Sequence, residues 1–375
     1  MRKDNGIMQD LKIENRNKIY NAIRKNGCVS GPSLIYELHL SRPTVTQNIN
    51  MLLEEGLICE KGSFGNTGGR RAKGYSIVET YRVSAGLDIT KNHITVLLVN
   101  LKGDIIYEKR IRYNFALTDE YRKKLGKLLE EALTETGVSQ NQVLGVGIAV
   151  PGLVTEDYKQ IFYGKILDFE GVTVDEFGKY IPFPCRLYND ADAGGYAEIS
   201  QNSDLKDAFY LSLSNNVGGS ILIDHTVYRG EGQRSGEVGH MTLIPDGCEC
   251  YCGKRGCVET YCNARILSDI CDGNLKEFFD RLNAGDKKCQ EVWEKYLYYL
   301  VIAVNNVRML FDCKIILGGY VGAYLDNYIG LIRRMARDRN TFENNADYLE
   351  VCNVKREALA LGSALPFIHE FWKNI

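Results

Sequence analysis

The chain has 375 residues, of which 45% are hydrophobic and 25% are charged, as in an ordinary globular protein with room for two or three domains. Its formal net charge of -2 argues against a uniformly basic nucleic-acid-binding protein. The charge is uneven, because residues 1–80 carry 12 Lys and Arg against 8 Asp and Glu, whereas the remainder carries 34 against 40. The basic excess therefore lies in the N-terminal segment.

The sequence contains no pattern typical of export or of membrane insertion. The first residues are polar and lack the apolar segment of a signal peptide. The longest apolar stretch, Tyr296 to Phe311, is interrupted by Asn305, Asn306 and Arg308 and is too short to span a bilayer. Five of the 12 cysteines fall within residues 248–262, which is a spacing typical of a metal site and not of a disulfide framework. We expect a cytoplasmic protein with no membrane partner.

The N-terminal segment predicts three short helices. Apolar residues recur at helical spacing up to Ile23, and Asn26-Gly27 ends that helix. Ser30 with Pro32, and then Ser41 with Pro43, are typical of an N-cap followed by the first helical turn. The second helix runs to Leu38, and Gly56 ends the third. The tight connection between them predicts a helix-turn-helix.

The third helix and the segment after it carry candidate DNA contacts. We expect an exposed helix face that offers side chains to base edges and phosphates, made of Arg42, Thr44, Gln47 and Asn48. The glycine-rich stretch 63–71 lies between two short strands and ends in Arg70 and Arg71, which predicts a wing that reaches phosphates or a minor groove. The alternative is a merely solvated helix face with surface arginines. The ordered succession of cap, helix, glycine and wing favours DNA binding.

From residue 83 onward, strands and helices alternate. Two similar strand-turn-strand units are expected at residues 83–99 and 208–223, and further strands end in glycine near Gly152 and Gly318. The long helix from Gln290 to Leu310 precedes the last of these strands. Two half-repeats of this kind predict a two-lobed α/β body with a ligand cleft between the lobes.

The most specific motif lies in residues 236–259. His240, Cys250, Cys252 and Cys257 supply one imidazole and three thiolates, which match a closed tetrahedral structural zinc site. Gly253 and Gly256 allow the backbone to fold tightly around the ion. A set of buried free cysteines is the alternative, and for the neighbouring Cys248 and Cys262 we expect no ligand role.

With these motifs the chain resembles the ROK family (repressors, open reading frames, kinases), in its regulator branch of xylose-type and N-acetylglucosamine-type repressors. The resemblance covers nearly the whole chain. It implies a winged helix-turn-helix at 1–80, followed by an actin-like ATPase (ribonuclease H-like) α/β fold. The two lobes of that fold are expected at 81–195 and 196–355, the second with the zinc site. A C-terminal helix at 356–375 is expected to pack back on the first lobe.

The resemblance also implies a sugar site between the lobes. The residues that it places there are Gly152, Asn189, Asp190, Glu237, His240 and Glu259. It further implies that His240 contacts the sugar while it ligates zinc, whose binding fixes the second ring nitrogen as a donor. Convergent carboxylates and amides suit a sugar because a misplaced hydroxyl leaves a buried group unpaired. The segment from Gly164 to Phe169 lacks the Asn and Trp often found there in the family, so the sugar stays unassigned.

In kinases that the chain resembles, the residue that matches Asp190 is the general base. The first phosphate loop of those kinases is of Asp-x-Gly-x-Thr type, whereas this chain has Asp88-Ile89-Thr90-Lys91-Asn92. The second is Gly-Thr-Gly-like there and Ser214-Asn215-Asn216 here. Because side chains at both loops obstruct the approach of phosphate to the backbone, we expect no bound Mg-ATP and no efficient transfer. The alternative is an ATP-dependent sugar kinase that retains Asp190 as base.

The sequence therefore predicts a homodimeric or homotetrameric, sugar-responsive repressor of carbohydrate-utilisation genes that binds operator DNA. A sugar effector is expected to favour one arrangement of the lobes and so to change the freedom of the DNA-binding domains. A zinc sensor is a third hypothesis, which four closed ligands disfavour.

Overall fold

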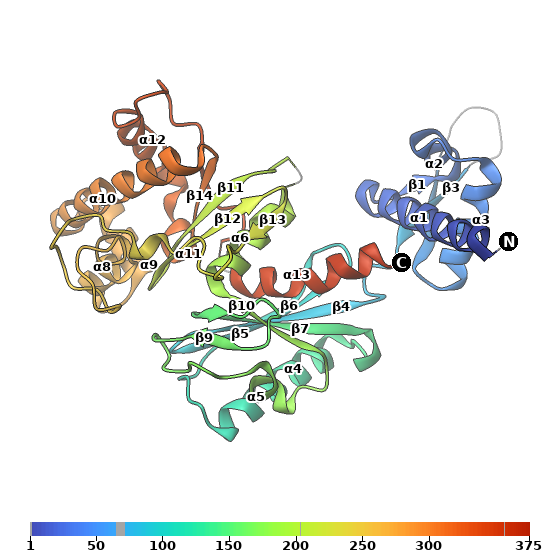
Figure 1. The fold of residues 1–375 in the computed structure, drawn as a ribbon, viewed down its shortest axis with the longest axis horizontal. Coiled ribbons are helices and arrows are strands. Elements are labelled where there is room, and N and C mark those ends of the chain that lie inside the picture. The colour runs from blue at the N-terminus through green and yellow to red at the C-terminus, as the bar shows by residue number, and fades with distance from the viewer. Residues whose placement is uncertain (1, 65–71, 203, 356) are drawn as a thin grey trace.

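The computed structural model describes residues 2–64, 72–202, 204–355 and 357–375. Three bodies are distinct in Figure 1: a small N-terminal domain, a first lobe with α4 and α5, and a second lobe with α10 and α12. The C-terminal helix α13 (Ala358–Lys373) runs from between the two lobes toward the N-terminal domain. Along the described ranges, no helix has the length and apolar character needed to cross a membrane.

The N-terminal domain is a winged helix-turn-helix. Its elements are α1 (Arg2–Asn26), β1 (Val29–Ser30), α2 (Gly31–Leu38), α3 (Arg42–Glu54), β2 (Ile58–Phe64) and β3 (Ala72–Ile77), with a sheet in the order β1-β3-β2. The predicted caps are confirmed, because the side chain of Ser30 accepts from the N–H of Ser33 and that of Ser41 accepts from the N–H of Thr44. Each of the two helices then begins with a proline within its first two positions.

The first lobe is built on a five-stranded sheet in the order β10-β7-β4-β5-β6. Its strands are β4 (Val83–Ile89), β5 (His93–Asn100), β6 (Ile105–Arg112), β7 (Val143–Val150) and β10 (Cys185–Asn189). Strands β4 and β5 are buried along almost their whole length, as expected for a sheet covered on both faces. Helix α4 (Asp119–Thr136) packs on this sheet, and the connection to β10 contains β8 (Leu153–Val154), β9 (Ile161–Tyr163) and α5 (Val174–Phe177).

The second lobe repeats the plan with a sheet in the order β13-β12-β11-β14-β15. Its strands are β11 (Ala208–Leu213), β12 (Val217–Ile223), β13 (Thr226–Tyr228), β14 (Lys314–Gly318) and β15 (Leu349–Val351). Its core is the largest set of buried side chains, gathered around α10 (Lys287–Phe311). The other helices of this lobe are α7 (Glu259–Cys262), α8 (Arg265–Ser268), α9 (Leu275–Asn283), α11 (Gly319–Gly322) and α12 (Ile329–Arg337). The predicted strand pairs and the long helix are confirmed.

Helices α6 (Asp190–Gln201) and α13 lie against each other between the two sheets. They approach closely because small residues line the contact: a Cβ on Gly362 of α13 would come within 1.7 Å of the carbonyl oxygen of Ala193. Helix α13 also packs on β4 and β7 of the first lobe, and α6 packs on β12 of the second. A lobe boundary at residue 195 falls inside α6, so this helix is a shared element of both lobes.

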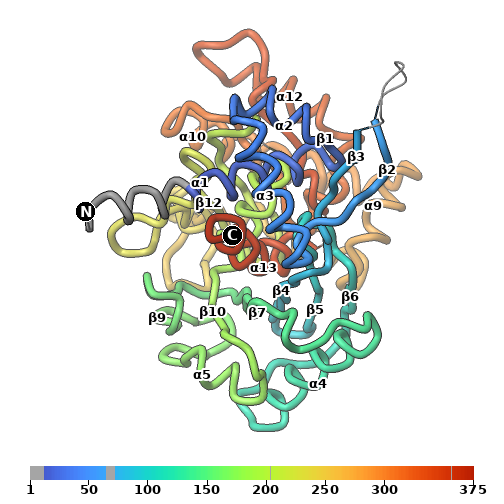
Figure 2. The backbone as a smooth tube through the Cα atoms, turned by 90° about the vertical axis from the view of Figure 1, so that its right-hand side faces the viewer, coloured from blue at the N-terminus to red at the C-terminus, as the bar shows by residue number. Residues whose placement is uncertain are grey.

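The N-terminal domain rests on the end of α13, as Figure 2 shows along the axis of that helix. Ile368 and Ile375 belong to the same buried cluster as the core of the winged helix. The side chain of Asn17 donates to the carbonyl oxygen of Lys373 at 2.8 Å, and the guanidinium of Arg24 lies 3.6 Å from the centre of the Trp372 ring. The DNA-binding domain is therefore attached to the helix that also contacts α6.

Candidate functional site

The predicted recognition helix α3 presents only part of the expected face to solvent. Arg42 and Gln47 are exposed and Thr44 is partly buried, with its hydroxyl 2.8 Å from that of Ser41. The prediction that Asn48 lies on the exposed face is wrong. Its side chain is buried and donates to the carbonyl oxygen of Thr44 at 2.8 Å. It shares the inner face with the apolar residues of the helix since it lies three or four positions from them.

Two residues that the sequence reasoning missed complete the exposed face of α3. Thr46 and Asn50 are exposed and follow Arg42 at intervals of four, so the three lie along one side of the helix. Their spacing from Arg42 was the signal that identifies them. Arg70 and Arg71 lie outside the described residues. The DNA contacts as a set stay a prediction.

A cleft between the lobes gathers most of the predicted sugar contacts. Gly152 lies in the first lobe, Asn189 and Asp190 start α6, and Glu237 and His240 come from the second lobe. All five line one cavity of about 50 Å³. The sequence reasoning did not identify further residues that line it, among them Tyr163, Lys165, Ser212, Asn216 and Tyr251.

Asn189 and Asp190 are held by the end of β10 and the first turn of α6. The side chain of Asn189 accepts from the N–H of Asp192 at 3.0 Å, which makes it the N-cap, and donates to the carbonyl oxygen of Gly152 at 3.1 Å. The carboxylate of Asp190 accepts from the N–H of Ala191 at 2.8 Å. Asn189 thereby fixes the start of α6 to the loop of the first lobe.

Burial raises the pKa values of the carboxyl groups in this cleft. It raises the pKa of Asp190 to about 6, although backbone N–H groups oppose the shift. Burial also raises the pKa of Glu237 to about 7, and the negative charges of Asp190 and Asp192 add to that shift. A ligand that donates hydroxyl hydrogens to these oxygens replaces the hydration that they have lost.

Glu259 is the one predicted sugar contact that does not line the cavity. Its buried carboxylate accepts from the N–H of Val217 at 2.5 Å and from the side chain of Asn216 at 3.2 Å. Asn216 and Val217 themselves line the cavity. Glu259 thus holds the loop between β11 and β12 against α7, and a direct sugar contact by Glu259 stays a prediction.

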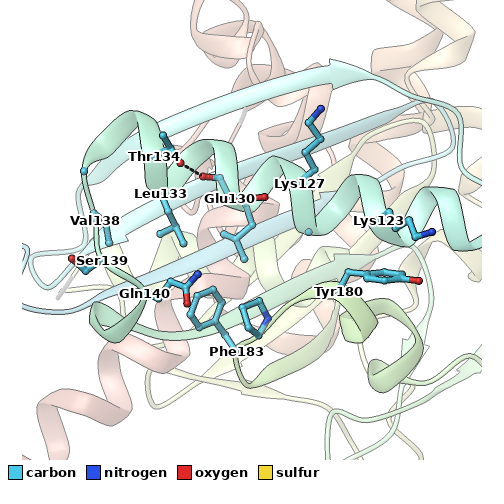
Figure 3. A pocket seen from close by; sticks show the side chains of 14 residues that line it. Lys123, Lys127, Glu130, Leu133, Thr134, Val138, Ser139, Gln140, Tyr180 and Phe183 are labelled. Carbon is cyan, nitrogen blue, oxygen red and sulfur yellow. Dashed lines mark hydrogen bonds between the residues drawn. The ribbon is translucent and has the colours of Figure 1, made fainter.

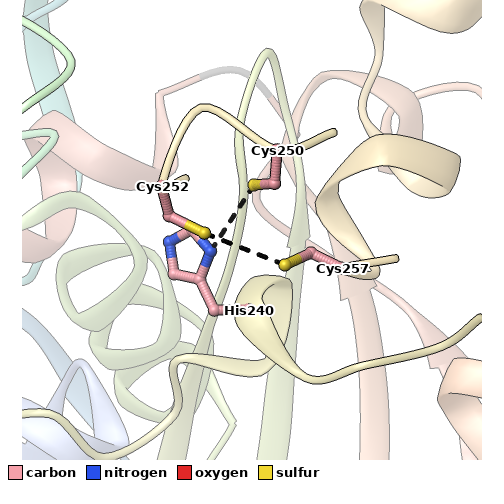
Figure 4. Close-up of side chains that lie close together, drawn as sticks. All are labelled: His240, Cys250, Cys252 and Cys257. Carbon is pink, nitrogen blue, oxygen red and sulfur yellow. Dashed lines mark hydrogen bonds between the residues drawn. The ribbon is translucent and has the colours of Figure 1, made fainter. Parts of the chain in front are cut away.

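His240, Cys250, Cys252 and Cys257 come together, as Figure 4 shows, and His240 also lines the cleft. Their ligand atoms all lie within 4.8 Å of one another. Nδ1 of His240 is 3.8 Å from Sγ of Cys250, and the same distance separates Sγ of Cys252 from Sγ of Cys257. Four ligand atoms at such separations can hold a metal ion, and Cys248 and Cys262 are not among them.

Backbone geometry explains why the loop closes around these four side chains. Gly253 and Gly256 have φ of +88° and +77°, a region that residues with a Cβ rarely adopt. A Cβ on Gly256 would also lie 1.7 Å from the carbonyl oxygen of Ile244. The ring nitrogen Nε2 of His240 is 3.2 Å from the hydroxyl of Tyr251 and 3.9 Å from Oε2 of Glu237, on the cleft side. The His240 ring thus joins the cluster to the cleft.

A second, larger cleft of about 680 Å³ is lined by residues of both lobes. Side chains from both predicted phosphate loops line it, among them Lys91, Asn92 and Asn215. The guanidinium of Arg110 on β6 lies 5.5 Å from the centre of the Tyr320 ring on α11, so the two lobes meet there through side chains.

Asp88 is buried in this region, and its Oδ1 has no hydrogen-bond partner within the described part of the chain. Burial raises the pKa of Asp88 to about 7, the charge of Asp190 adds to the shift, and Arg110 opposes it. A carboxylate with an open acceptor atom is compatible with a cation, as the sequence reasoning allowed.

A further cavity, of about 870 Å³, lies elsewhere, on the outer side of the first lobe. Figure 3 shows its labelled side chains on α4, on the segment after it, and at Tyr180 and Phe183. None of the predicted site residues lines it, and its size alone points to no chemistry.

The fold and the two sites define a class of protein: a winged helix-turn-helix DNA-binding domain joined to a two-lobed, actin-like sugar-kinase fold. The ROK family profile matches residues 84–367, and a winged helix-turn-helix DNA-binding profile matches residues 14–58. The chain therefore belongs to the ROK family.

Among its relatives is the xylose repressor of Bacillus subtilis strain 168, 27% identical over 315 residues that make up 80% of each chain. Another is the DNA-binding transcriptional dual regulator NagC of Escherichia coli strain K12, 26% identical over 341 residues, or 84% of this chain and 82% of NagC. Among solved structures, a ROK family transcriptional regulator homologous to the E. coli MLC protein has a TM-score of 0.73 at 22% identity and covers 97% of both chains. This last similarity establishes the fold, including its N-terminal domain.

Proposed function

We propose that this protein is a sugar-responsive repressor of carbohydrate-utilisation genes. The observation that carries the proposal is one continuous connection. Asp190 in the cleft is the first residue of α6, α6 packs on α13, and α13 holds the winged helix. The names of the relatives, a xylose repressor and the regulator NagC, support the same function.

The size of the cleft explains how a sugar would act. The cleft is narrow, with a volume of about 50 Å³ against about 220 Å³ for the cavity next to it. A sugar that binds there favours an arrangement in which the walls of the cleft lie farther apart. Sugar therefore binds the open arrangement better than the closed one, and that difference in affinity is what shifts the equilibrium.

The movement reaches the DNA-binding domain through side-chain contacts. The hydroxyl of Tyr196 on α6 is 2.5 Å from Nδ1 of His369 on α13, and the His369 ring lies 4.6 Å from that of Trp372. Trp372 in turn contacts Arg24 of α1 and donates to the carbonyl oxygen of Leu101 at 3.0 Å. A displacement of α6 against α13 therefore changes the position of the winged helix relative to the lobes.

The assembly that we propose is a homodimer, or a homotetramer made of two such dimers, that places two winged helices on a palindromic operator. Two-fold symmetric proteins read two-fold symmetric sites, with half-sites separated by whole turns of the duplex. The exposed residues of α3 enter the major groove, and the basic N-terminal segment supplies the salt-dependent contact with phosphate.

We propose that the His/Cys cluster holds a structural zinc ion. Tetrahedral thiolates about 2.3 Å from zinc lie about 3.8 Å from one another, in agreement with the 3.8 Å between Sγ of Cys252 and Sγ of Cys257. His240 would bind zinc through Nδ1, which leaves Nε2 as a hydrogen-bond donor toward the sugar cleft. Zinc supplies the cross-link that holds residues 240–257 as one wall of the cleft.

The proposed function predicts no efficient phosphoryl transfer, because side chains occupy both phosphate loops. The kinase alternative retains Asp190 as the base, and it is tested by sugar-dependent ADP release with Mg-ATP. Turnover comparable to that of ordinary kinases, about 1–100 per second, would contradict the prediction that the side chains of these loops prevent phosphoryl transfer. A zinc sensor would exchange its metal reversibly without loss of the fold.

The direct test is a DNA-binding titration with the full-length protein and the upstream region of its own gene, at moderate salt, with and without a panel of sugars. We expect specific binding that one sugar weakens by about 5- to 150-fold, the usual range of coupling between two sites. Absence of specific DNA binding would contradict the proposal.

A further inference from the structure

A second cavity of about 220 Å³, which we call the hinge cavity, shares Asn189 with the sugar cleft. Its walls come from the segment after β8, the end of β10, strand β13 with Arg229 after it, and the facing sides of α6 and α13. Both lobes and the helix that carries the winged helix therefore meet around it. Its volume lies below the ~300–1,000 Å³ of pockets for drug-sized ligands, so it suits a ligand of a single ring.

Two partly buried charged side chains face each other in the hinge cavity. Nε of Arg229 is 3.6 Å from Oδ2 of Asp192, and the other carboxylate oxygen accepts from the hydroxyl of Ser220 at 3.1 Å. Nη2 of Arg229 donates to the carbonyl oxygen of Val154 at 2.6 Å. At 3.6 Å the Arg229–Asp192 contact is longer than a hydrogen bond, so both groups keep capacity for a ligand: donors on the guanidinium and an acceptor on the carboxylate.

Aromatic rings form the other side of the hinge cavity. The rings of Tyr158 and Tyr188 lie 5.0 Å apart at 45°, and Tyr196 adds a third ring from α6. Tyr158 has φ of +62°, a costly backbone conformation for an aromatic residue. The guanidinium of Arg229 lies 4.8 Å from the centre of its ring, so the strained turn places Tyr158 against Arg229.

The charges of the cavity select a neutral ligand. Arg229 is compensated by Asp192, and Arg186 forms a two-pronged ion pair with Glu370 at 2.5 and 3.0 Å. An anionic ligand would meet two carboxylates, and a cationic one would meet two guanidiniums. A sugar ring packs its C–H groups against aromatic faces and forms hydrogen bonds to carboxylates and guanidiniums through its hydroxyl groups. The hinge cavity offers both kinds of group.

We propose that the hinge cavity is a second effector site, which binds a neutral monosaccharide. Its position gives the ligand a regulatory role, a step that rests on the proposed function. Glu370 and Pro366 of α13 line the cavity, and the next turn of the same helix holds Arg24 through Trp372. A monosaccharide bound between α6 and α13 holds these helices, and with them the winged helix, in one relative position.

The test is calorimetric titration of the full-length, zinc-loaded protein with D-xylose, D-glucose and N-acetyl-D-glucosamine. We expect two binding events per chain with at least one of these sugars. Glu237→Gln abolishes sugar binding in the sugar cleft. Arg229→Met and Asp192→Asn each weaken sugar binding in the hinge cavity by about tenfold or more, because each removes a charged hydrogen-bonding group.

Arg234→Met is the matched control, since Arg234 also lies over an aromatic ring, Phe162, but does not line the hinge cavity. It leaves both events intact. A single event that Glu237→Gln removes and Arg229→Met spares overturns the hinge site and leaves the proposed function standing. A second event that survives both hinge variants also overturns it. Two events in a protein that binds no DNA support the hinge site and contradict the proposed function instead.

Discussion

The two clefts between the lobes differ in what lines them. The sugar cleft is narrow and lined by two carboxylates, the amides of Asn189 and Asn216, and the imidazole of the His/Cys cluster. The second cleft is wider, and residues of both predicted phosphate loops line it together with Arg110 and Tyr320. Recognition of hydroxyl groups depends on a few well-placed side chains, whereas phosphate binding depends on bare backbone, so we expect the first cleft to bind sugar and the second to bind phosphate poorly.

The largest expected effect concerns the wall of the sugar cleft. Cys257→Ser, or removal of metal with a chelator, should unfold residues 240–257 and destabilise the second lobe, because binding of structural zinc contributes on the order of 10 kcal/mol. The measurement is thermal unfolding with a metal assay. Cys248→Ser is the control, since Cys248 lies outside the cluster, and it should leave the unfolding temperature unchanged. Equal stability of the Cys257→Ser and native proteins would contradict a structural metal.

Asp190→Asn tests whether the carboxylate of Asp190 binds sugar in the sugar cleft. The amide keeps the hydrogen bond from the N–H of Ala191 but cannot accept ligand hydroxyls as a carboxylate does, so sugar affinity should fall about 10- to 100-fold. DNA affinity without sugar should not change. Calorimetry and a DNA-binding assay measure the two quantities, with the exposed Asp175→Asn as control. Unaltered sugar binding in Asp190→Asn would remove Asp190 from the site.

Asp88→Asn tests the region of the second cleft through pH. Burial raises the pKa of Asp88 from its ordinary value of 3.8 to about 7 in the folded protein, so the folded state binds the proton more tightly than the unfolded state. The stability that this proton provides is fully present below about pH 4 and is lost as the pH rises toward 7. The neighbouring groups Asp190, Arg110, Tyr121 and Tyr320 share in this balance.

The Asn variant cannot ionise, so it should be more stable than the native chain at pH 8, by about 4 kcal/mol. At pH 4 the two should be nearly equal. Denaturant unfolding at both pH values measures the difference, and the exposed Asp347→Asn should show none. A native chain that is as stable as Asp88→Asn at pH 8 would indicate that a bound cation compensates the carboxylate.

Trp372→Ala should give the smallest effect and tests the connection from the sugar cleft to the winged helix. It removes the contact with Arg24 and the hydrogen bond to Leu101, so the sugar should change DNA affinity several-fold less than in the native protein. Sugar affinity itself should stay the same. Trp293→Phe, in the second lobe, is the control. Full coupling in Trp372→Ala would place the connection elsewhere.

Local signals were read correctly where short-range physics decides the outcome. Ser30 and Ser41 cap their helices, and Gly253 and Gly256 take the backbone conformations that close the His/Cys cluster. Asn48 was misplaced although its spacing carried the information. It lies three residues after Val45 and four before Leu52, and a polar side chain on that face was read as a DNA contact.

The sequence by itself determined the winged helix, the two-lobed plan and the four side chains of the His/Cys cluster, because each depends on residue type at fixed spacing. Only the tertiary structure decided that Glu259 supports the loop at Asn216, that the hinge cavity lies beside Asp192, and that Trp372 meets Arg24. These contacts join residues up to several hundred positions apart. Their partners are chosen by the packing of whole helices and sheets, which no local pattern encodes.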